Sequence, residues 1–510
     1  MAQRASPRER ATGALLVFAA LALLAAFVTR NGTFFDDEIA SIRLMEAASD
    51  WRAVIVEANG SDVHPPLGYV IDFVLFGLLG SWKAVQCVAG LANAAALAAF
   101  VALAGRALPR RAWLVLCALA ATDATAIMWG ASLRWYAWFH PVFLLALAAV
   151  LWAPWRAVAC AAAIAVAGVV LFHISYLALA AMPVLGLLWF ARYARTLAPR
   201  EAALCAALAL AAAVLCLPQA RVLLAVHLAG QGQQRGGLPL ALIQSSITLI
   251  FGNAVFPLGI VPLAGALGQG LALLNFALTA DPEERARWLP LFRAIALGLA
   301  LLILSGLGYK PRNAVFLTLA LLPLLATALA ALPRHLGAPA LLAVAALQIT
   351  GLANVALHHD TAKRSFNTPY PELVARIGSY RRACPRLVVA HDDEVLGYLL
   401  PRTIPQSRPT GTATLRLERG DCVVLVSGSA FERLSPAVGR WRAALESPAL
   451  SPERAEVFHP EPAVALAARW IGRTVEPWAA RLELRRAAAP LALPVDARGA
   501  ELSPARFNRD

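Results

Sequence analysis

Apolar runs long enough to cross a bilayer recur along most of this sequence, and they limit what it can fold into. The first extends from Ala11 to Val28, close to the roughly 20 residues that a membrane-spanning helix needs. Hydrophobic residues make up 59% of the 510 residues and charged residues only 15%, which excludes an ordinary soluble enzyme. A cleaved signal peptide is the alternative for residues 1–28. Because further apolar runs follow at close intervals, we predict a polytopic α-helical membrane protein instead.

The positions of the arginines predict on which side of the membrane each end of these runs lies. Arg4, Arg8 and Arg10 precede the first run, so the N-terminus is expected in the cytoplasm. The net charge of +14 lies in short loops, which fits positive-inside topology and anionic lipid headgroups better than nucleic acid. The short apolar segment 67–80 contains Asp72. If this segment lies along the interface rather than across the membrane, the later basic loops also become cytoplasmic.

With that assignment the sequence predicts about eleven spans. They cover 11–28, 84–104, 112–130, 137–153, 157–172, 174–191, 201–218, 244–266, 288–306, 314–332 and 338–357. Residues 1–357 are therefore expected to form the transmembrane domain, with an extracytoplasmic loop at 30–83 that carries interfacial helices. An odd number of spans from a cytoplasmic start places the rest of the chain outside the cytoplasm.

Residues 358–510 have a different composition, because they are charged, rich in proline and unable to span a membrane. Segments 387–390 and 422–426 have the pattern of buried strands, and 394–400 that of a following helix. A small extracytoplasmic α/β domain is the result that we predict. Cys384 and Cys422 lie in it, and both a disulfide and free thiols are open alternatives for them.

One cluster in this domain, His391-Asp392-Asp393-Glu394, has the residue types of a metal site. It follows a predicted strand and begins a predicted helix, so we interpret its acids as helix caps. No metal ligands are assigned in the chain.

Three carboxylates, Asp36, Asp37 and Glu38, stand just after the first span, on its outer side. Acidic groups held against a bilayer are expensive, and their default interpretation is functional. One alternative is that Asp36 or Asp37 caps a following helix while Glu38 favours its dipole. A partly desolvated carboxylate beside a cation is also what a general base requires. Three adjacent acids allow one to cap while another reacts.

The same loop contains His64-Pro65-Pro66. Pro65 biases His64 towards an extended backbone, and Pro66 is suited to open a helix. His64 would then lie near a helix N-terminus, where a phosphate binds readily. The alternative is a simple turn with a surface histidine.

Polar residues from distant segments reach the same outer face in the predicted topology. Arg134 and Tyr136 follow the third span, and His173 ends a later one. Arg134 is either functional or a snorkelling residue beside an aromatic belt, and His173 is either functional or packed against its neighbours. Lys310 and Arg312 oppose the positive-inside trend, which favours a role in holding a lipid phosphate. No nucleotide-binding motif appears, which argues against a nucleotide-driven pump.

These motifs, in their order along the chain, resemble those of the GT-C superfamily of membrane glycosyltransferases. The bacterial branch related to protein O-mannosyltransferases and to the aminoarabinose transferase of lipid A is the most similar. The resemblance covers roughly residues 10–357 and rests on Phe35-Asp36-Asp37-Glu38, His64-Pro65-Pro66-Leu67, Arg134-Trp135-Tyr136 and the Lys310–Arg312 loop. This chain has Gly68, Ile174 and Asn313 where the family often has tyrosine, so the sugar and the acceptor stay open.

The resemblance implies an inverting glycosyltransferase that moves a sugar from a polyprenyl-phosphate donor to a lipid, polysaccharide or protein acceptor outside the cytoplasm. Asp37 would be the general base, next to Asp36 and Glu38. His64, Arg134, Tyr136, His173, Lys310 and Arg312 would bind the substrate and its phosphate. No cofactor is expected, and a divalent metal is left open. The alternative function is a transporter or flippase of a lipid-linked sugar, whose ionisable residues should lie near the middle of the bilayer or on both faces.

Overall fold

The structure is a computed structural model of the full chain. It describes residues 3–31, 36–62, 64–228, 238–252, 254–255, 259–305, 310–357, 370–401, 403–409, 411, 413–427, 436–458 and 480–495. The chain divides into two compact units, one of Met1–Gly32 with Ala40–Lys363 and one of Thr33–Ile39 with Arg364–Asp510. Each unit is described by itself below.

The first unit is a helical bundle. Its helices are α1 (Pro7–Asn31), α2 (Asp36–Ala47, whose first residues belong to the second unit), α3 (Trp51–Ser61), α4 (Leu67–Leu79), α5 (Trp82–Ala104), α6 (Arg110–Ala121), α7 (Ala124–Gly130), α8 (Trp135–Trp152), α9 (Ala157–Ile174), α10 (Ala178–Tyr193), α11 (Pro199–Leu228), α12 (Leu238–Phe251), α13 (Ile260–Thr279), α14 (Pro282–Leu304), α15 (Val315–Ala331) and α16 (Arg334–Leu357). A short 3-10 helix, Pro311–Ala314, leads into α15.

Among the described residues, nine helices are long and apolar enough to cross a membrane. The pair α6 and α7 makes a tenth, bent by 45°. Helix α10 is apolar but shorter, with 16 residues. The predicted count of about eleven is therefore reached only if α10 also crosses.

One predicted span is wrong. Residues 244–266 do not form one helix, because α12 ends at Phe251 and α13 begins at Ile260. The span in this region is α13, which extends to Thr279. Glycines end one helix and begin the other: Gly252 has φ +64° after α12, and Gly259 has φ +149° before α13. Such backbone conformations favour glycine and stop a helix.

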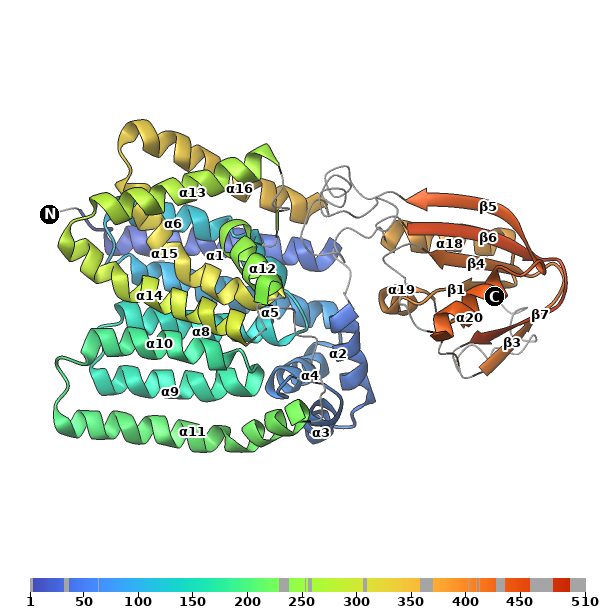
Figure 1. The fold of residues 1–510 in the computed structure, drawn as a ribbon, viewed down its shortest axis with the longest axis horizontal. Coiled ribbons are helices and arrows are strands. Elements are labelled where there is room, and N and C mark those ends of the chain that lie inside the picture. The colour runs from blue at the N-terminus through green and yellow to red at the C-terminus, as the bar shows by residue number, and fades with distance from the viewer. Residues whose placement is uncertain are drawn as a thin grey trace. The chain divides into compact units, whose positions relative to one another are not determined.

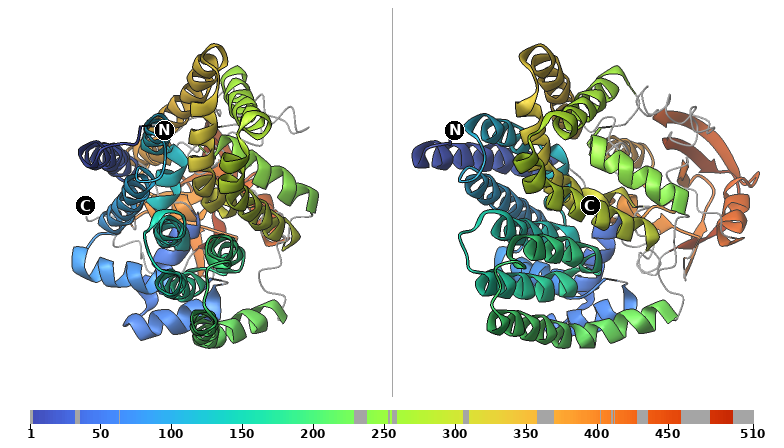
Figure 2. Two further views of the ribbon diagram at one scale, coloured as in Figure 1. Left: turned by 90° about the vertical axis from the view of Figure 1, so that its left-hand side faces the viewer. Right: turned by 60° about the vertical axis from the view of Figure 1, so that its left-hand side comes forward.

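Helices α3 and α4 lie across the direction of the spans, at the end of the bundle opposite the N-terminus. They are seen nearly end-on in Figure 1 and along their length in the left view of Figure 2, where the spans are seen end-on. The orientation of α4 agrees with the expectation that segment 67–80 does not cross the membrane. Helix α3 is capped by Asp50, whose side chain accepts hydrogen bonds from the backbone N–H groups of Arg52 and Ala53.

Small residues allow the spans to approach one another closely. Helices α1 and α5 meet at Gly90, where a methyl group would lie 2.7 Å from the Cβ of Ala25. One turn further along α5, buried Asn93 donates to the carbonyl oxygens of Gly130, at 3.3 Å, and Ala137, at 2.7 Å. This side chain therefore holds the connection between α7 and α8, which carries Arg134.

The other end of the bundle is basic. Arg110, at the start of α6, pairs with Glu9 at 2.8 Å, and Arg287 donates to the carbonyl oxygen of Ala107. These contacts hold together three segments at this end of the bundle: the N-terminal segment, the connection before α6 and the start of α14. The distribution is the one that positive-inside topology predicts for cytoplasmic loops.

The C-terminal unit contains a mixed seven-stranded sheet of order β3-β7-β2-β1-β4-β6-β5. Its strands are β1 (Leu387–Ala390), β2 (Gln406–Ser407), β3 (Ala413–Leu417), β4 (Cys422–Ser427), β5 (Leu450–Phe458), β6 (Ala480–Ala487) and β7 (Leu491–Val495), and its helices are α18 (Tyr370–Ala383), α19 (Glu394–Leu399) and α20 (Pro436–Leu445). Strand β1 is parallel to β2 and β4, and the other pairs are antiparallel. The two predicted strands and the helix after them are confirmed, and so is the small α/β unit.

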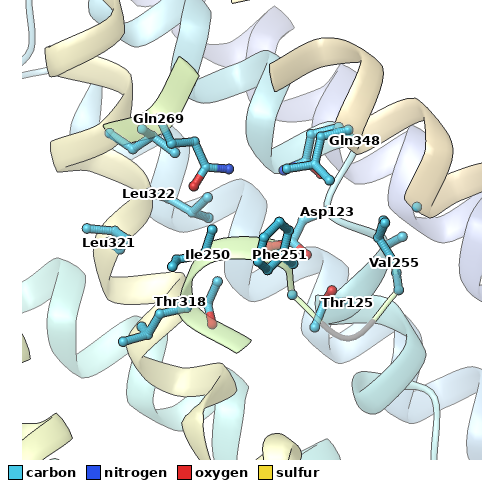
Figure 3. A pocket seen from close by; sticks show the side chains of 17 residues that line it. Asp123, Thr125, Ile250, Phe251, Val255, Gln269, Thr318, Leu321, Leu322 and Gln348 are labelled. Carbon is cyan, nitrogen blue, oxygen red and sulfur yellow. The ribbon is translucent and has the colours of Figure 1, made fainter. Parts of the chain in front are cut away.

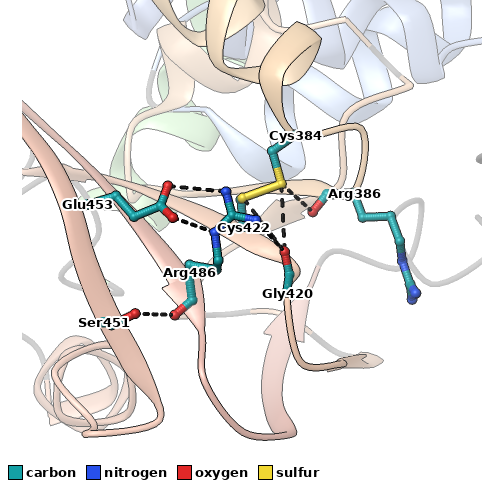
Figure 4. A network of polar contacts seen from close by, with 7 residues as sticks. All are labelled: Cys384, Arg386, Gly420, Cys422, Ser451, Glu453 and Arg486. Atoms are coloured by element: carbon teal, nitrogen blue, oxygen red, sulfur yellow. Dashed lines mark hydrogen bonds and ion pairs between the residues drawn. A yellow bond between two sulfur atoms is a disulfide. The ribbon is translucent and has the colours of Figure 1, made fainter.

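Two further expectations in this unit are resolved. Asp393 caps α19, because its side chain accepts from the backbone N–H of Leu396 at 2.7 Å. Cys384 and Cys422 form a disulfide that links the end of α18 to the first residue of β4 (Figure 4). Arg486 of β6 lies beside it and pairs with Glu453 of β5.

We expect the disulfide to contribute substantially to the stability of this unit. The cysteines are 38 residues apart, and closing a loop of that length in the unfolded chain stabilises the fold by about 3–4 kcal/mol. Replacing both cysteines by serine should therefore lower the melting temperature of the sheet unit, as followed by limited proteolysis of the full chain. Alkylation of Cys384 or Cys422 without prior reduction would contradict the bond.

Candidate functional site

The candidate site is built around Arg134, which stands between α7 and α8. Its backbone is extended, with φ −140° and ψ 162°, so it precedes α8 without continuing the helix from α7. The Asn93 hydrogen bonds on both sides of this connection fix its path. The Arg134 side chain is only 5% exposed, although it carries a permanent charge. A buried guanidinium of this kind needs partners.

Three segments of the bundle supply those partners. Nη1 of Arg134 lies 2.9 Å from Oγ of Ser41 in α2, 3.0 Å from the hydroxyl of Tyr69 in α4 and 3.3 Å from Oδ2 of Asp62. The Tyr69 hydroxyl in turn donates to Oδ2 of Asp62 at 2.7 Å. Arg134 thus joins α2, α4 and the start of α8 through one nitrogen atom.

Asp62 is the anion of this cluster, and sequence reasoning did not select it. Burial raises the pKa of its carboxyl group, but the charge of Arg134 and the hydrogen bonds from the Tyr69 hydroxyl and the backbone N–H of His64 outweigh burial, so the pKa is lowered. Asp62 therefore carries its charge at neutral pH. Its other oxygen, Oδ1, accepts from the backbone N–H of His64 at 3.1 Å. An aspartate side chain that accepts from the backbone N–H two residues later forms a common type of turn. The Asp62-Val63-His64-Pro65 pattern is the sequence signal that could have identified Asp62.

His64 is half-buried beside the start of α8. Its ring centroid lies 5.6 Å from that of Trp135. Burial lowers the pKa of the imidazole, and the Arg134 charge lowers it further, against the opposing effect of Asp62. His64 is therefore neutral at pH 7, which leaves it one N–H donor and one acceptor nitrogen.

Lys310 and Arg312 lie near this group, although they come much later in the sequence, just before α15. The Arg312 guanidinium lies 5.9 Å from the ring centroid of Tyr136, which is fully buried. The charges of both cations also depress the pKa of His64, which shows that they lie near it. The structure thus brings together His64, Arg134, Tyr136, Lys310 and Arg312, which are separate in sequence.

The remaining predicted residues are placed elsewhere. Nδ1 of His173 bonds to the carbonyl oxygen of Val169 in its own helix, and no contact among the described residues joins it to the Arg134 cluster. Asp36, Asp37 and Glu38 form the first turn of α2 and group with the C-terminal unit. Asp37 is half-buried and Glu38 is 2% exposed, whereas the side chain of Asp36 lies outside the described part of the chain.

Comparison with known proteins bears on the fold. No protein-family model matches the chain, and no curated protein matches it. The structure is similar to the crystal structure of ArnT from Cupriavidus metallidurans bound to undecaprenyl phosphate, with a TM-score of 0.50 at 12% identity. The likeness covers 93% of this chain and 98% of that one, so it includes the C-terminal unit as well as the bundle. The predicted fold, a bundle of membrane-spanning helices with a small C-terminal α/β unit, is thereby confirmed.

The low pKa of His64 has a consequence for acid stability. Because its pKa in the folded protein lies below the ordinary value of 6.5, the unfolded chain binds a proton first as the pH falls, and folding loses stability below pH 6.5. Between pH 7.5 and 5, the unfolding free energy of the His64→Gln variant should fall by about 2 kcal/mol less than that of the wild type. Thermal unfolding over this range measures the effect.

The matched control is His335→Gln, since His335 is exposed. We expect it to keep the acid sensitivity of the wild type. Equal sensitivity of the His64 variant and the wild type would contradict a buried, neutral His64.

Proposed function

We propose that the protein is a glycosyltransferase that moves a sugar from a polyprenyl-phosphate donor to an acceptor of the cell envelope. The observation that carries this proposal is the meeting of Arg134, His64, Lys310 and Arg312 in one region of the bundle. A fold shared with ArnT, whose crystal structure holds undecaprenyl phosphate, supports the same class of donor.

The cations suit the phosphate of such a donor. Arg134 is held by Ser41, Tyr69 and Asp62, so its role is to shape the site and set its charge. Lys310 and Arg312 approach from the segment before α15, and their charges act on His64. Charge-assisted hydrogen bonds from such residues stabilise a phosphate strongly. We assign phosphate binding to Lys310 and Arg312, with neutral His64 as an additional N–H donor.

Asp37 is the proposed general base, with Asp36 and Glu38 beside it in the first turn of α2. Asp37 precedes Ser41 by four residues, and residues spaced in this way share one face of a helix. Ser41 accepts a hydrogen bond from Arg134, so the same face of α2 carries both the proposed base and a contact to the cation cluster. Glu38, three residues before Ser41, shares this face as well, so the choice of Asp37 follows the resemblance, in which the aspartate of the Asp-Glu pair is the base.

In the proposed reaction, an acceptor hydroxyl attacks the anomeric carbon from the face opposite the phosphate, which inverts that carbon. Asp37 takes the hydroxyl proton. The bond between the anomeric carbon and the phosphate oxygen breaks, and polyprenyl phosphate leaves with the electron pair. The leaving oxygen gains negative charge in the transition state, where preorganised donors lower the barrier most. This reaction needs no nucleotide.

The proposed location is the plasma membrane of a bacterium, with the site and the C-terminal unit outside the cytoplasm. The Cys384–Cys422 disulfide supports this, because such bonds persist in oxidising compartments. The basic end of the bundle, which carries Arg110 and Arg287, would then face the cytoplasm.

The assignment of the base leads to a direct test. We expect Asp37→Asn to insert and fold normally but to lose at least about 100-fold in turnover of a polyprenyl-phosphate sugar, since general bases contribute about 10²–10⁴-fold. Asp50→Asn is the matched control: Asp50 is exposed, caps the adjacent α3, and asparagine caps equally well. Full turnover by the Asp37 variant would overturn the assignment.

Lys310 offers a second test, of phosphate binding. Replacing Lys310 by Ala should raise the KM for the donor about 10- to 100-fold, the range of one charge-assisted hydrogen bond, and leave the KM for the acceptor nearly unchanged. Steady-state kinetics with each substrate varied separately measures both constants. Equal increases in the two constants would count against a phosphate contact at Lys310.

A further inference from the structure

A cavity with a few polar side chains in its lining lies in the bundle, where the bent pair α6 and α7 breaks. Its volume is about 40 Å³, and it is lined by residues from α7, α12, α13, α15 and α16. One water molecule needs roughly 10–15 Å³ of such space, so the cavity holds a small ion with one or two waters and excludes a sugar ring. It is separate from the residues proposed to carry out transfer.

The only acidic residue among those that line the cavity is Asp123. It stands between Ala121 and Ala124, at the break within the bent span, and is 6% exposed. One of its oxygens accepts from the backbone N–H of Ala126 at 2.9 Å, which caps α7. None of the described residues that line the cavity is Lys, Arg or His. With no basic residue among the described residues that line its cavity, this carboxyl group either takes up a proton or, when ionised, is stabilised by a bound cation.

Two glutamine side chains are directed at the same space (Figure 3). Gln269 of α13 is 8% exposed, and Gln348 of α16 is half-buried. In the described part of the chain, neither side chain has a hydrogen-bond partner. Buried amides are normally hydrogen-bonded, so the buried Gln269 amide, aimed into the cavity opposite half-buried Gln348, indicates a ligand site.

Helix ends add to the negative character of the cavity. Helix α12 ends here, and its last residues, Leu249 to Phe251, line the space together with the following Gly252. Gly252 allows this close approach, because a methyl group at that position would lie 2.3 Å from Oγ1 of Thr125. Helix α6 ends beside Asp123. The C-terminus of a helix carries about half a negative charge, and its last carbonyl oxygens are free to bind cations.

We propose that this cavity binds a small monovalent cation such as Na⁺. The carboxylate of Asp123, the amide oxygens of Gln269 and Gln348, and the last carbonyls of α12 are oxygen ligands, which hard cations prefer. A single carboxylate neutralises one positive charge, whereas a divalent ion would leave a net charge inside the bundle. Broken helices with carbonyl ends are a known setting for Na⁺ in membrane proteins.

The test compares purified full-length protein in NaCl and in choline chloride at equal ionic strength. Thermal unfolding should show a melting temperature roughly 2–4 °C higher in NaCl, because an ion that binds only the folded state stabilises it. Equilibrium dialysis with radioactive Na⁺ should find one saturable site per chain. Equal melting temperatures with no saturable binding would overturn the proposal.

Asp123→Asn is the decisive variant, because asparagine keeps the cap of α7 but removes the charge. It should abolish both the Na⁺-dependent shift and the saturable binding. The control is Asp281→Asn, which changes an exposed cap of α14 whose side chain accepts from the backbone N–H of Glu284. It should behave as wild type.

A second variant, Gln269→Leu, should weaken Na⁺ binding at least tenfold without changing the charge. An undiminished Na⁺ shift in Asp123→Asn would overturn the proposed site. A shift produced by CaCl₂ but not by NaCl would overturn the assignment of a monovalent ion. Neither result depends on transferase activity, so this proposal and the proposed function are tested separately.

Discussion

The burial of one positive charge determines how this end of the bundle is built. The Arg134 guanidinium is almost inaccessible, and it is compensated by Asp62, Ser41 and Tyr69 from three different segments. Removing one partner of a buried ion pair costs about 3–5 kcal/mol, because the other charge is left uncompensated. The crossing helices α3 and α4 are therefore held against the spans by electrostatics as well as by apolar contact. Burial depresses the pKa of His64, and the same charge lowers it further.

Several features could be predicted from the sequence because local physics determines them. Apolar length located most spans, and a composition change located the C-terminal unit, whose strand Leu387–Ala390 is fully buried. The segment 244–266 was assigned wrongly because composition alone does not reveal a break between two apolar helices. The signal that could have shown it was the glycine at each side of the break, Gly252 and Gly259.

The candidate site was partly predictable for a similar reason. Charged residues out of place in a membrane protein, such as Arg134 and Lys310, are conspicuous in a sequence. Their partners are not: Ser41 and Tyr69 are ordinary residue types, and only the packing of distant helices brings them to Arg134. The intramembrane Asp123 was missed because it lies in an apolar run that was assigned as one straight span.

A structure determined in lipid nanodiscs with undecaprenyl phosphate bound would test the proposed function most directly. If the function is correct, the phosphate lies within hydrogen-bond distance of Lys310 or Arg312, on the side of the bundle where Arg134 is buried. A phosphate bound instead at the opposite end, beside Arg110 and Arg287, would contradict it.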